Sequence, residues 1–346
     1  MTRPELRLST RVLRANIEAV RTRIAPSALM LVLKDDAYGH GLSWVVETAI
    51  DSGVEWFGSY DIRSGIDVRR VAGGDVRIFA WVTSTDGEID DALLQRIDLG
   101  VGTIEYLRRI IARAEALGTR ARVHLKIDTG LHRNGILPED WESAVAEARR
   151  AERAGHLDVE GVWSHIAEAS DADDDVAQAV FLDAVRVVGE SGATPAALHL
   201  TASAASWWRP ELRGTVSRIG AFCYGVRSAD GPELEGIRPV ASLIATVIDV
   251  TDEVVTFGIG SFDGLPSTLS GAFVGTPGGA RALTSIGHTT SVVQAWPGVQ
   301  VGDEIVVFGD GAHGESSATT LAERIDTVGE EILTRLTSRV RRVVAD

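Results

Sequence analysis

The stretch ARVHLKIDTGLHRNGILPEDWESAVAEARRAERAGHLDVEGVWSHI (121–166) contains one complete unit of alternating secondary structure. Residues 121–128 and 159–166 are short, largely apolar runs with β-branched side chains, which predicts two buried strands. Between them, residues 141–155 have the amphipathic, Ala-, Arg- and Glu-rich pattern of a helix. A helix that connects two strands of one sheet makes them parallel, so the stretch predicts a parallel sheet covered by helices.

The same alternation extends in both directions along the chain. Strand-like runs lie at 28–34, 56–61, 75–82, 97–102, 121–128, 159–166, 197–203 and 216–225, with helical segments between them and a helix at 10–25 before the first. Eight strand–helix units predict an α/β fold, the (β/α)8 TIM barrel.

The sequence changes character near residue 230. A linker-like segment at 228–239 precedes Val- and Thr-rich runs that are broken by Gly and Pro, which is typical of short strands. We therefore predict two domains, a barrel at 1–230 and a C-terminal β-rich domain at 231–346.

Composition excludes several classes of function. The net charge of −15 argues against binding to a nucleic-acid backbone or an anionic membrane, both of which require clustered positive charge. Cys223 is the one cysteine, so neither an intramolecular disulfide nor a Cys-rich metal site is expected. We see no signal-peptide pattern and no run of 18 apolar residues, and we expect a soluble, cytoplasmic protein without a metal.

The chain has only two lysines among its 34 basic residues, and both lie at or near the ends of predicted barrel strands. Barrel enzymes place their active sites at the carboxyl ends of the strands. Lys34 and Lys126 lie there, together with His165, Ser203 and Arg218. A lysine whose pKa is lowered can attack an aldehyde as a neutral amine, whereas arginine keeps its proton, so lysine at these positions indicates Schiff-base chemistry.

Five segments resemble motifs of the alanine racemase family, which are pyridoxal 5′-phosphate (PLP) enzymes of fold type III. KDDAYGHG (34–41) is similar to the family's cofactor-lysine motif, and further motifs are matched by HLKIDTGLHRNG (124–135), WSHIAEA (163–169), TASAAS (201–206) and SRIGAFCYG (217–225). The resemblance implies a barrel with a C-terminal β domain, PLP as the cofactor, an amino acid as the small-molecule substrate and a head-to-tail homodimer.

The resemblance also implies roles for individual residues. Lys34 would be the Schiff-base lysine and one catalytic base, and Tyr38 would donate to the cofactor phosphate with Ser203. The amides of Gly220 and Ala221 would complete that phosphate site. Arg218 would face the pyridine nitrogen and His165 would orient Arg218. Arg133 would contact the phenolic oxygen and the substrate carboxylate, and Lys126 is carbamylated in many family members.

One half of the family's site is altered. Racemisation in this family uses a second base, a tyrosine from the partner's C-terminal domain, yet no tyrosine follows Tyr224 here. Depending on the alignment, Phe257 or Ser261 takes a tyrosine position. His288 is our candidate for a replacement catalytic base, because imidazole titrates near neutral pH. His313 is a weaker candidate.

Three readings of the function therefore stay open. The first is an amino-acid racemase of the alanine racemase type. The second is a PLP enzyme of another class, such as a decarboxylase, an aldolase or an enzyme of specialised metabolism. The third is a PLP-binding relative that does not racemise.

Overall fold

The computed structural model describes residues 3–346, and the chain divides into two compact units. One unit contains residues 20–34 and 49–220, and the other contains residues 3–19, 35–48 and 221–346. We call them the barrel unit and the β unit, and each is described by itself.

The barrel unit contains an eight-stranded sheet in the order β8-β7-β6-β5-β4-β3-β2-β9, in which every described pair is parallel. Its strands are β2 (Ala28–Val32), β3 (Trp56–Tyr60), β4 (Arg77–Ala80), β5 (Asp98–Val101), β6 (Ala121–Lys126), β7 (Leu157–Trp163), β8 (Ala197–His199) and β9 (Val216–Ile219). Each lies within or overlaps one of the eight predicted runs. The predicted TIM barrel is thereby confirmed.

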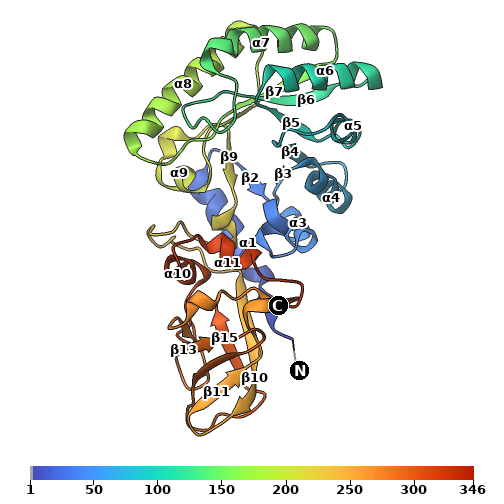
Figure 1. The fold of residues 1–346 in the computed structure, drawn as a ribbon. Coiled ribbons are helices and arrows are strands. Elements are labelled where there is room, and N and C mark those ends of the chain that lie inside the picture. Colours follow the sequence, from blue (N-terminus) through green and yellow to red (C-terminus); the bar gives the residue numbers. More distant parts are fainter. Residues whose placement is uncertain (1–2) are drawn as a thin grey trace. The chain divides into compact units, whose positions relative to one another are not determined.

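Helices alternate with these strands, as Figure 1 shows: α4 (Ile62–Ala72), α5 (Asp86–Leu94), α6 (Ile104–Leu117), α7 (Pro138–Arg153), α8 (Asp171–Glu190) and the short α9 (Ser203–Trp208). Their starting points follow from local sequence. Thr85 and Glu88 form a reciprocal capping box before α5, and the Ser170 hydroxyl accepts a hydrogen bond from the Asp173 amide at the start of α8. Pro138 opens α7, where a missing N–H costs nothing.

Aromatic side chains fill part of the barrel core. Phe79 and Trp163 pack edge to face with ring centroids 5.2 Å apart, and Met30, Ala197 and Val216 complete a buried cluster around them. Parallel strands covered by helices are buried on both faces, so apolar residues occur on them in runs rather than in strict alternation.

The β unit contains a second eight-stranded sheet, in the order β12-β13-β14-β11-β10-β1-β16 with β15 paired to β10. Its strands are β1 (Glu5–Leu8), β10 (Ala241–Val250), β11 (Val254–Phe257), β12 (Phe273–Val274), β13 (Arg281–Ile286), β14 (Ser291–Gln294), β15 (Glu304–Phe308) and β16 (Arg341–Val344). The predicted β-rich C-terminal domain is confirmed. The amino-terminal strand β1 joins the same sheet, between β10 and β16.

The helices α1 (Thr10–Ile24) and α3 (Leu42–Asp51) each contain residues of both units. The helices α10 (Ala318–Glu323) and α11 (Gly329–Thr334) belong to the β unit. The predicted linker at 228–239 contains neither helix nor strand. Among the described residues, no helix combines the length and the apolar character needed to cross a membrane.

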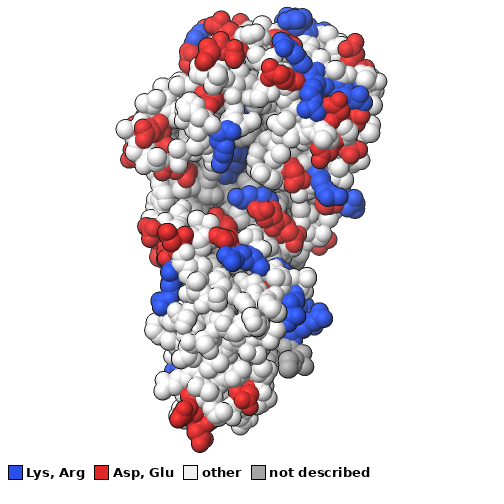
Figure 2. All heavy atoms as spheres, in the orientation of Figure 1, with Lys and Arg blue, Asp and Glu red and all other residues white. Residues whose placement is uncertain are grey.

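Charged side chains of both signs are interspersed on the face of the barrel unit that Figure 2 shows. The area over β10, β11 and β13 of the β unit is mostly uncharged in the same view. Large apolar side chains are exposed on the β unit, among them Phe262, Phe273 and Val301.

Candidate active site

The cofactor-lysine motif begins with an unusual backbone. Lys34–Tyr38 forms a short helical segment, α2, in which Asp35, Asp36 and Ala37 all have φ of 55° and Tyr38 has φ of 54°. A left-handed turn of this kind is unfavourable for most L-residues, and aspartate tolerates it better than most. Asp35 stands where the family usually has alanine, so this departure suits the local backbone.

Contacts within the β unit hold this turn in place. The Asp36 carboxylate accepts a hydrogen bond from the Leu42 amide at 2.8 Å. The His40 ring stacks on Tyr224, and its Nδ1 lies 2.9 Å from the Ala37 carbonyl oxygen. Tyr38 is buried beside Tyr224, and burial raises the pKa of the Tyr38 phenol well above its ordinary value.

The barrel unit gathers seven of the ten predicted site residues at the carboxyl ends of its strands. Lys34 follows β2 by two residues, Lys126 is the last residue of β6, and His165 follows β7 by two residues. The others are Arg133 in the loop after β6, Ser203 at the start of α9, Arg218 on β9 and Gly220 directly after β9. The carboxyl ends of a barrel's strands meet at one face, so these residues share the face at which barrel enzymes place their active sites.

The Arg218 guanidinium donates five hydrogen bonds to other described residues. Within residues 3–346, its Nη1 donates to the Nδ1 and the carbonyl oxygen of His199 at 3.0 and 2.8 Å. Its Nη2 donates to the Nδ1 of His165 at 3.2 Å and to two carbonyl oxygens, those of Ser164 and Leu200. All five acceptors are neutral, and burial lowers the pKa of Arg218 to about 9. The guanidinium is therefore a buried cation whose orientation is fixed by hydrogen bonds to uncharged partners.

The positive charges of this face act on one another. Burial, together with repulsion from Arg218 and Arg133, lowers the pKa of Lys126 to about 8, against the opposing effect of Asp128. Burial also lowers the pKa of His165 to about 3, reinforced by Arg218, Arg133, Lys126 and Lys34. His165 is thus neutral at physiological pH, and its Nδ1 is able to accept from Arg218.

These residues suit a phosphorylated aldehyde such as PLP. Lys34, Lys126, Arg133 and Arg218 form a cationic group, and an anionic ligand would offset part of its charge. The Gly220 amide points to the Ser203 hydroxyl at 3.2 Å, so an amide and a hydroxyl are paired at the end of β9. Lys34 supplies an amine at the neighbouring strand, since β2 and β9 pair in parallel register.

The remaining three predicted residues, Tyr38, Ala221 and His288, belong to the β unit. Ala221 opens a short 3-10 helix that ends at Tyr224. His288 lies in the turn between β13 and β14, is exposed, and stacks on Phe262 with ring centroids 4.7 Å apart. Phe257, one of the two residues at a family tyrosine position, is fully buried on β11, and Ser261 begins a 3-10 helix.

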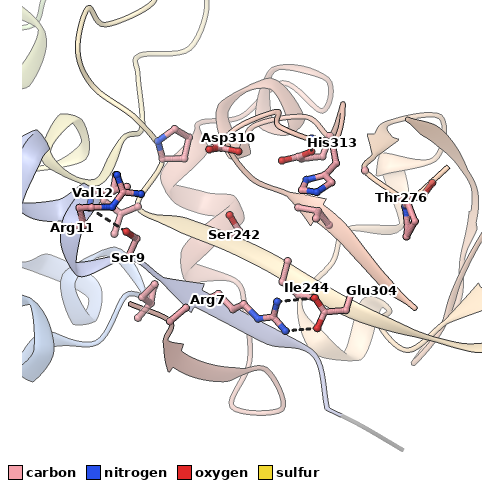
Figure 3. A pocket seen from close by; sticks show the side chains of 18 residues that line it. Arg7, Ser9, Arg11, Val12, Ser242, Ile244, Thr276, Glu304, Asp310 and His313 are labelled. Atoms are coloured by element: carbon pink, nitrogen blue, oxygen red, sulfur yellow. Dashed lines mark hydrogen bonds and ion pairs between the residues drawn. The ribbon is translucent and has the colours of Figure 1, made fainter. Parts of the chain in front are cut away.

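His313, the weaker candidate for a second base, lines a pocket of about 510 Å³ within the β unit (Figure 3). Thr276 and Asp310 line the same pocket, and so do Arg7 and Glu304, which form an ion pair. None of the ten residues predicted for the site lines this pocket.

Comparisons with known proteins identify the family. Residues 8–228 match the family described as alanine racemase, N-terminal domain, and residues 244–344 match alanine racemase, C-terminal domain. The chain belongs to the alanine racemase family. An alanine racemase from Thermobifida fusca is 33% identical over 372 residues, which cover 98% of this chain and 97% of that protein.

Solved structures of the alanine racemase family agree with the observed fold. Alanine racemase from Streptomyces coelicolor A3(2) superimposes with a TM-score of 0.92 at 31% identity, covering 99% of this chain and 98% of that chain. Alanine racemase from the D-cycloserine producer Streptomyces lavendulae gives a TM-score of 0.91 at 30% identity, covering 100% and 98%. The family's enzymes are PLP-dependent isomerases, so the sequence-based assignments of the family, the enzyme class and the cofactor are confirmed.

Sequence reasoning missed the polar residues beneath the catalytic face. Asp98, His124 and His199 lie on β5, β6 and β8, are fully buried, and connect to Arg218. A signal for them was present, because a histidine or an aspartate inside an otherwise apolar strand needs a buried partner.

Buried neutral histidines predict a loss of stability in acid. Burial lowers the pKa of His40 to about 4, that of His165 to about 3, and that of His199 well below 6.5. Below pH 6.5 the unfolded chain binds protons at these positions and the folded chain does not, so the free energy of unfolding falls as the pH falls. Each histidine contributes a slope of about 1.4 kcal/mol per pH unit.

Urea unfolding at a series of pH values between 7 and 4.5 measures this dependence. We expect a His40→Gln variant to have a slope smaller by about one proton than the parent protein. An identical slope in the two proteins contradicts the prediction.

Proposed function

We propose that this protein is a PLP-dependent amino-acid racemase, with alanine as the first substrate to test and Lys34 as the residue that attaches the cofactor. The observation that carries the proposal is the position of Lys34 at the end of β2, within a cluster of cations that suits PLP. Bound PLP supplies an electron sink that makes the α-proton of an attached amino acid removable.

The chain's own residues have separate tasks in this proposal. Lys34 removes the α-proton from one face and returns it. Ser203, Tyr38 and the amides of Gly220 and Ala221 bind the phosphate, and Arg133 binds the substrate carboxylate. Arg218, directed by His165, holds a fixed positive charge against the ring nitrogen.

The second face needs a proton donor other than tyrosine. We propose His288 from the partner subunit of a head-to-tail homodimer for this task. Its exposure on the turn between β13 and β14 supports the assignment, because an imidazole that serves another subunit's site must be accessible. The surface over β10, β11 and β13, which is mostly uncharged apart from acidic side chains at its lower end, is consistent with a covered face (Figure 2).

Proton NMR of the PLP-loaded protein with L-alanine in D2O, followed by chiral analysis, tests the proposal. We expect the α-proton signal to disappear and D-alanine to form. In a His288→Asn variant, exchange at the α-carbon should continue while inversion falls by roughly 10²-fold or more. A His313→Asn variant examines the weaker candidate, which also belongs to the β unit, and it should keep the parent rate of inversion if His288 is the base.

Each outcome has a distinct meaning. Inversion that survives in His288→Asn removes His288 from its role and leaves the racemase proposal standing. Exchange without inversion in the parent protein means that Lys34 works alone. No exchange with alanine or with a panel of other L-amino acids contradicts the racemase proposal.

One observation favours a second candidate function, a PLP enzyme of another class. The absence of any tyrosine after Tyr224 removes the base on which the family's two-base reaction depends. Release of carbon dioxide, or cleavage of a β-hydroxy amino acid, by the PLP-loaded protein would support that candidate.

A further inference from the structure

A chain of hydrogen bonds crosses the buried interior of the barrel unit. It runs from Arg218 on β9 to His199 on β8, then to His124 on β6 and to Asp98 on β5. The joining distances are 3.0 Å to His199 Nδ1, 2.8 Å between His199 Nε2 and His124 Nδ1, and 3.4 Å between His124 Nε2 and Asp98 Oδ2. Asp98, His124 and His199 have no exposed surface, and Arg218 is 4% exposed.

The donor at one end fixes the direction of every bond in the chain. Arginine only donates, so His199 Nδ1 must accept and the His199 proton must lie on Nε2. That proton is donated to His124 Nδ1, which places the His124 proton on Nε2, facing Asp98. Both imidazoles are therefore neutral Nε2–H tautomers, and all donors point toward the carboxylate.

Asp98 is held as an anion at the far end. Burial raises the pKa of this carboxyl, but the hydrogen bond from His124 and the charges of Arg77 and Arg122 oppose burial, and the pKa stays below its ordinary value. Arg77 Nη2 and Arg122 Nη2 each lie 2.6 Å from Asp98 oxygens. A charged acceptor makes the hydrogen bond from His124 stronger than one to a neutral group.

The surrounding side chains leave room for this chain and exclude water from it. A Cβ on Gly161, which lies on β7 between β6 and β8, would be 2.4 Å from His124 Nδ1, so the absence of a side chain lets the two imidazoles meet. Phe79 packs against both rings, at 4.7 and 5.1 Å between centroids. Trp163 stacks on His199 at an interplanar angle of 10°. In such an environment each hydrogen bond is electrostatically stronger than in water.

We propose that Asp98, His124 and His199 form a positioning relay that orients the Arg218 guanidinium and supports its charge against the cofactor ring. The proposal rests on the proposed function, since it assigns Arg218 to the PLP ring. Within residues 3–346, the five groups that accept hydrogen bonds from Arg218 are neutral, and the relay connects it to a buried carboxylate. The relay thus extends the cofactor site from the catalytic face into the core, through residues that do not touch substrate.

Nitrogen-15 NMR of histidine-labelled protein without cofactor tests the relay directly. We expect His124 and His199 to show neutral Nε2–H signals at pH 7, with slow solvent exchange, and we expect the His124 signal to shift in an Asp98→Asn variant. A charged imidazole or an Nδ1–H tautomer at either position overturns the proposal. This readout needs neither PLP nor activity, so it stands or falls separately from the proposed function.

The second readout uses the PLP-loaded enzyme. In Asp98→Asn we expect the visible absorption band of bound PLP to shift and kcat to fall by about 10- to 100-fold, as for other residues that orient a site from behind. KM should stay within about twofold of the parent value, because Asp98 is buried and does not contact the substrate carboxylate.

Glu160→Gln is the matched control, because Glu160 also pairs with Arg77, at 3.0 Å, but lies outside the relay. We expect Glu160→Gln to keep the parent absorption band and kcat. His124→Asn is the second relay variant, used where Asp98→Asn does not fold: its side-chain oxygen is able to accept from His199 but the bond to Asp98 is lost. A parent-like absorption band and kcat in a folded relay variant overturn the proposal.

Discussion

Replacing Lys34 with arginine removes covalent attachment of PLP and lowers racemisation by roughly 10²- to 10⁴-fold or more, because arginine keeps its proton and neither forms a Schiff base nor acts as a base. Borohydride reduction of the PLP-loaded protein, followed by peptide mass mapping, measures the attachment. The chain has only two lysines, so the label has only Lys34 and Lys126 as lysine sites.

We expect the parent protein to carry the reduced cofactor on Lys34 and the Lys34→Arg variant to carry none. Lys126→Arg is the control for labelling, because it removes the other lysine and should keep the label on Lys34. A label on Lys126 in the parent protein would contradict the assignment of Lys34.

Replacing Arg218 with lysine lowers the free energy of unfolding by about 3 kcal/mol, because a buried ammonium cannot serve five acceptors that are arranged around a planar guanidinium. The charge is unchanged, so the loss reports the hydrogen bonds rather than the removal of a cation. Urea unfolding of the cofactor-free protein measures it.

Arg113→Lys is the control for this experiment. Arg113 pairs with Asp90 at the surface, at 2.5 Å, where the pair is screened by solvent. We expect its unfolding midpoint to match that of the parent protein. An Arg218→Lys variant that is equally stable would show that the five hydrogen bonds contribute little.

The fold of this protein was largely predictable from its sequence. Eight apolar runs alternating with amphipathic helices have few arrangements other than a barrel, because buried parallel strands need helices on the outer face. The two lysines and Arg218 were found from the same pattern, since their positions after or within strands assign them to the carboxyl face. The family motifs then added the cofactor.

Only the tertiary structure decided how these residues are connected. β1 is near in sequence to the barrel but joins the sheet of the β unit. The sequence did not predict this pairing, because the partner strands β10 and β16 lie more than 200 residues away in the chain. The relay behind Arg218 shows the same limit. Asp98, His124 and His199 are far apart in sequence, and their contact depends on the strand register and on the missing side chain of Gly161. Sequence patterns report which face a residue takes, whereas register and packing decide which side chains meet.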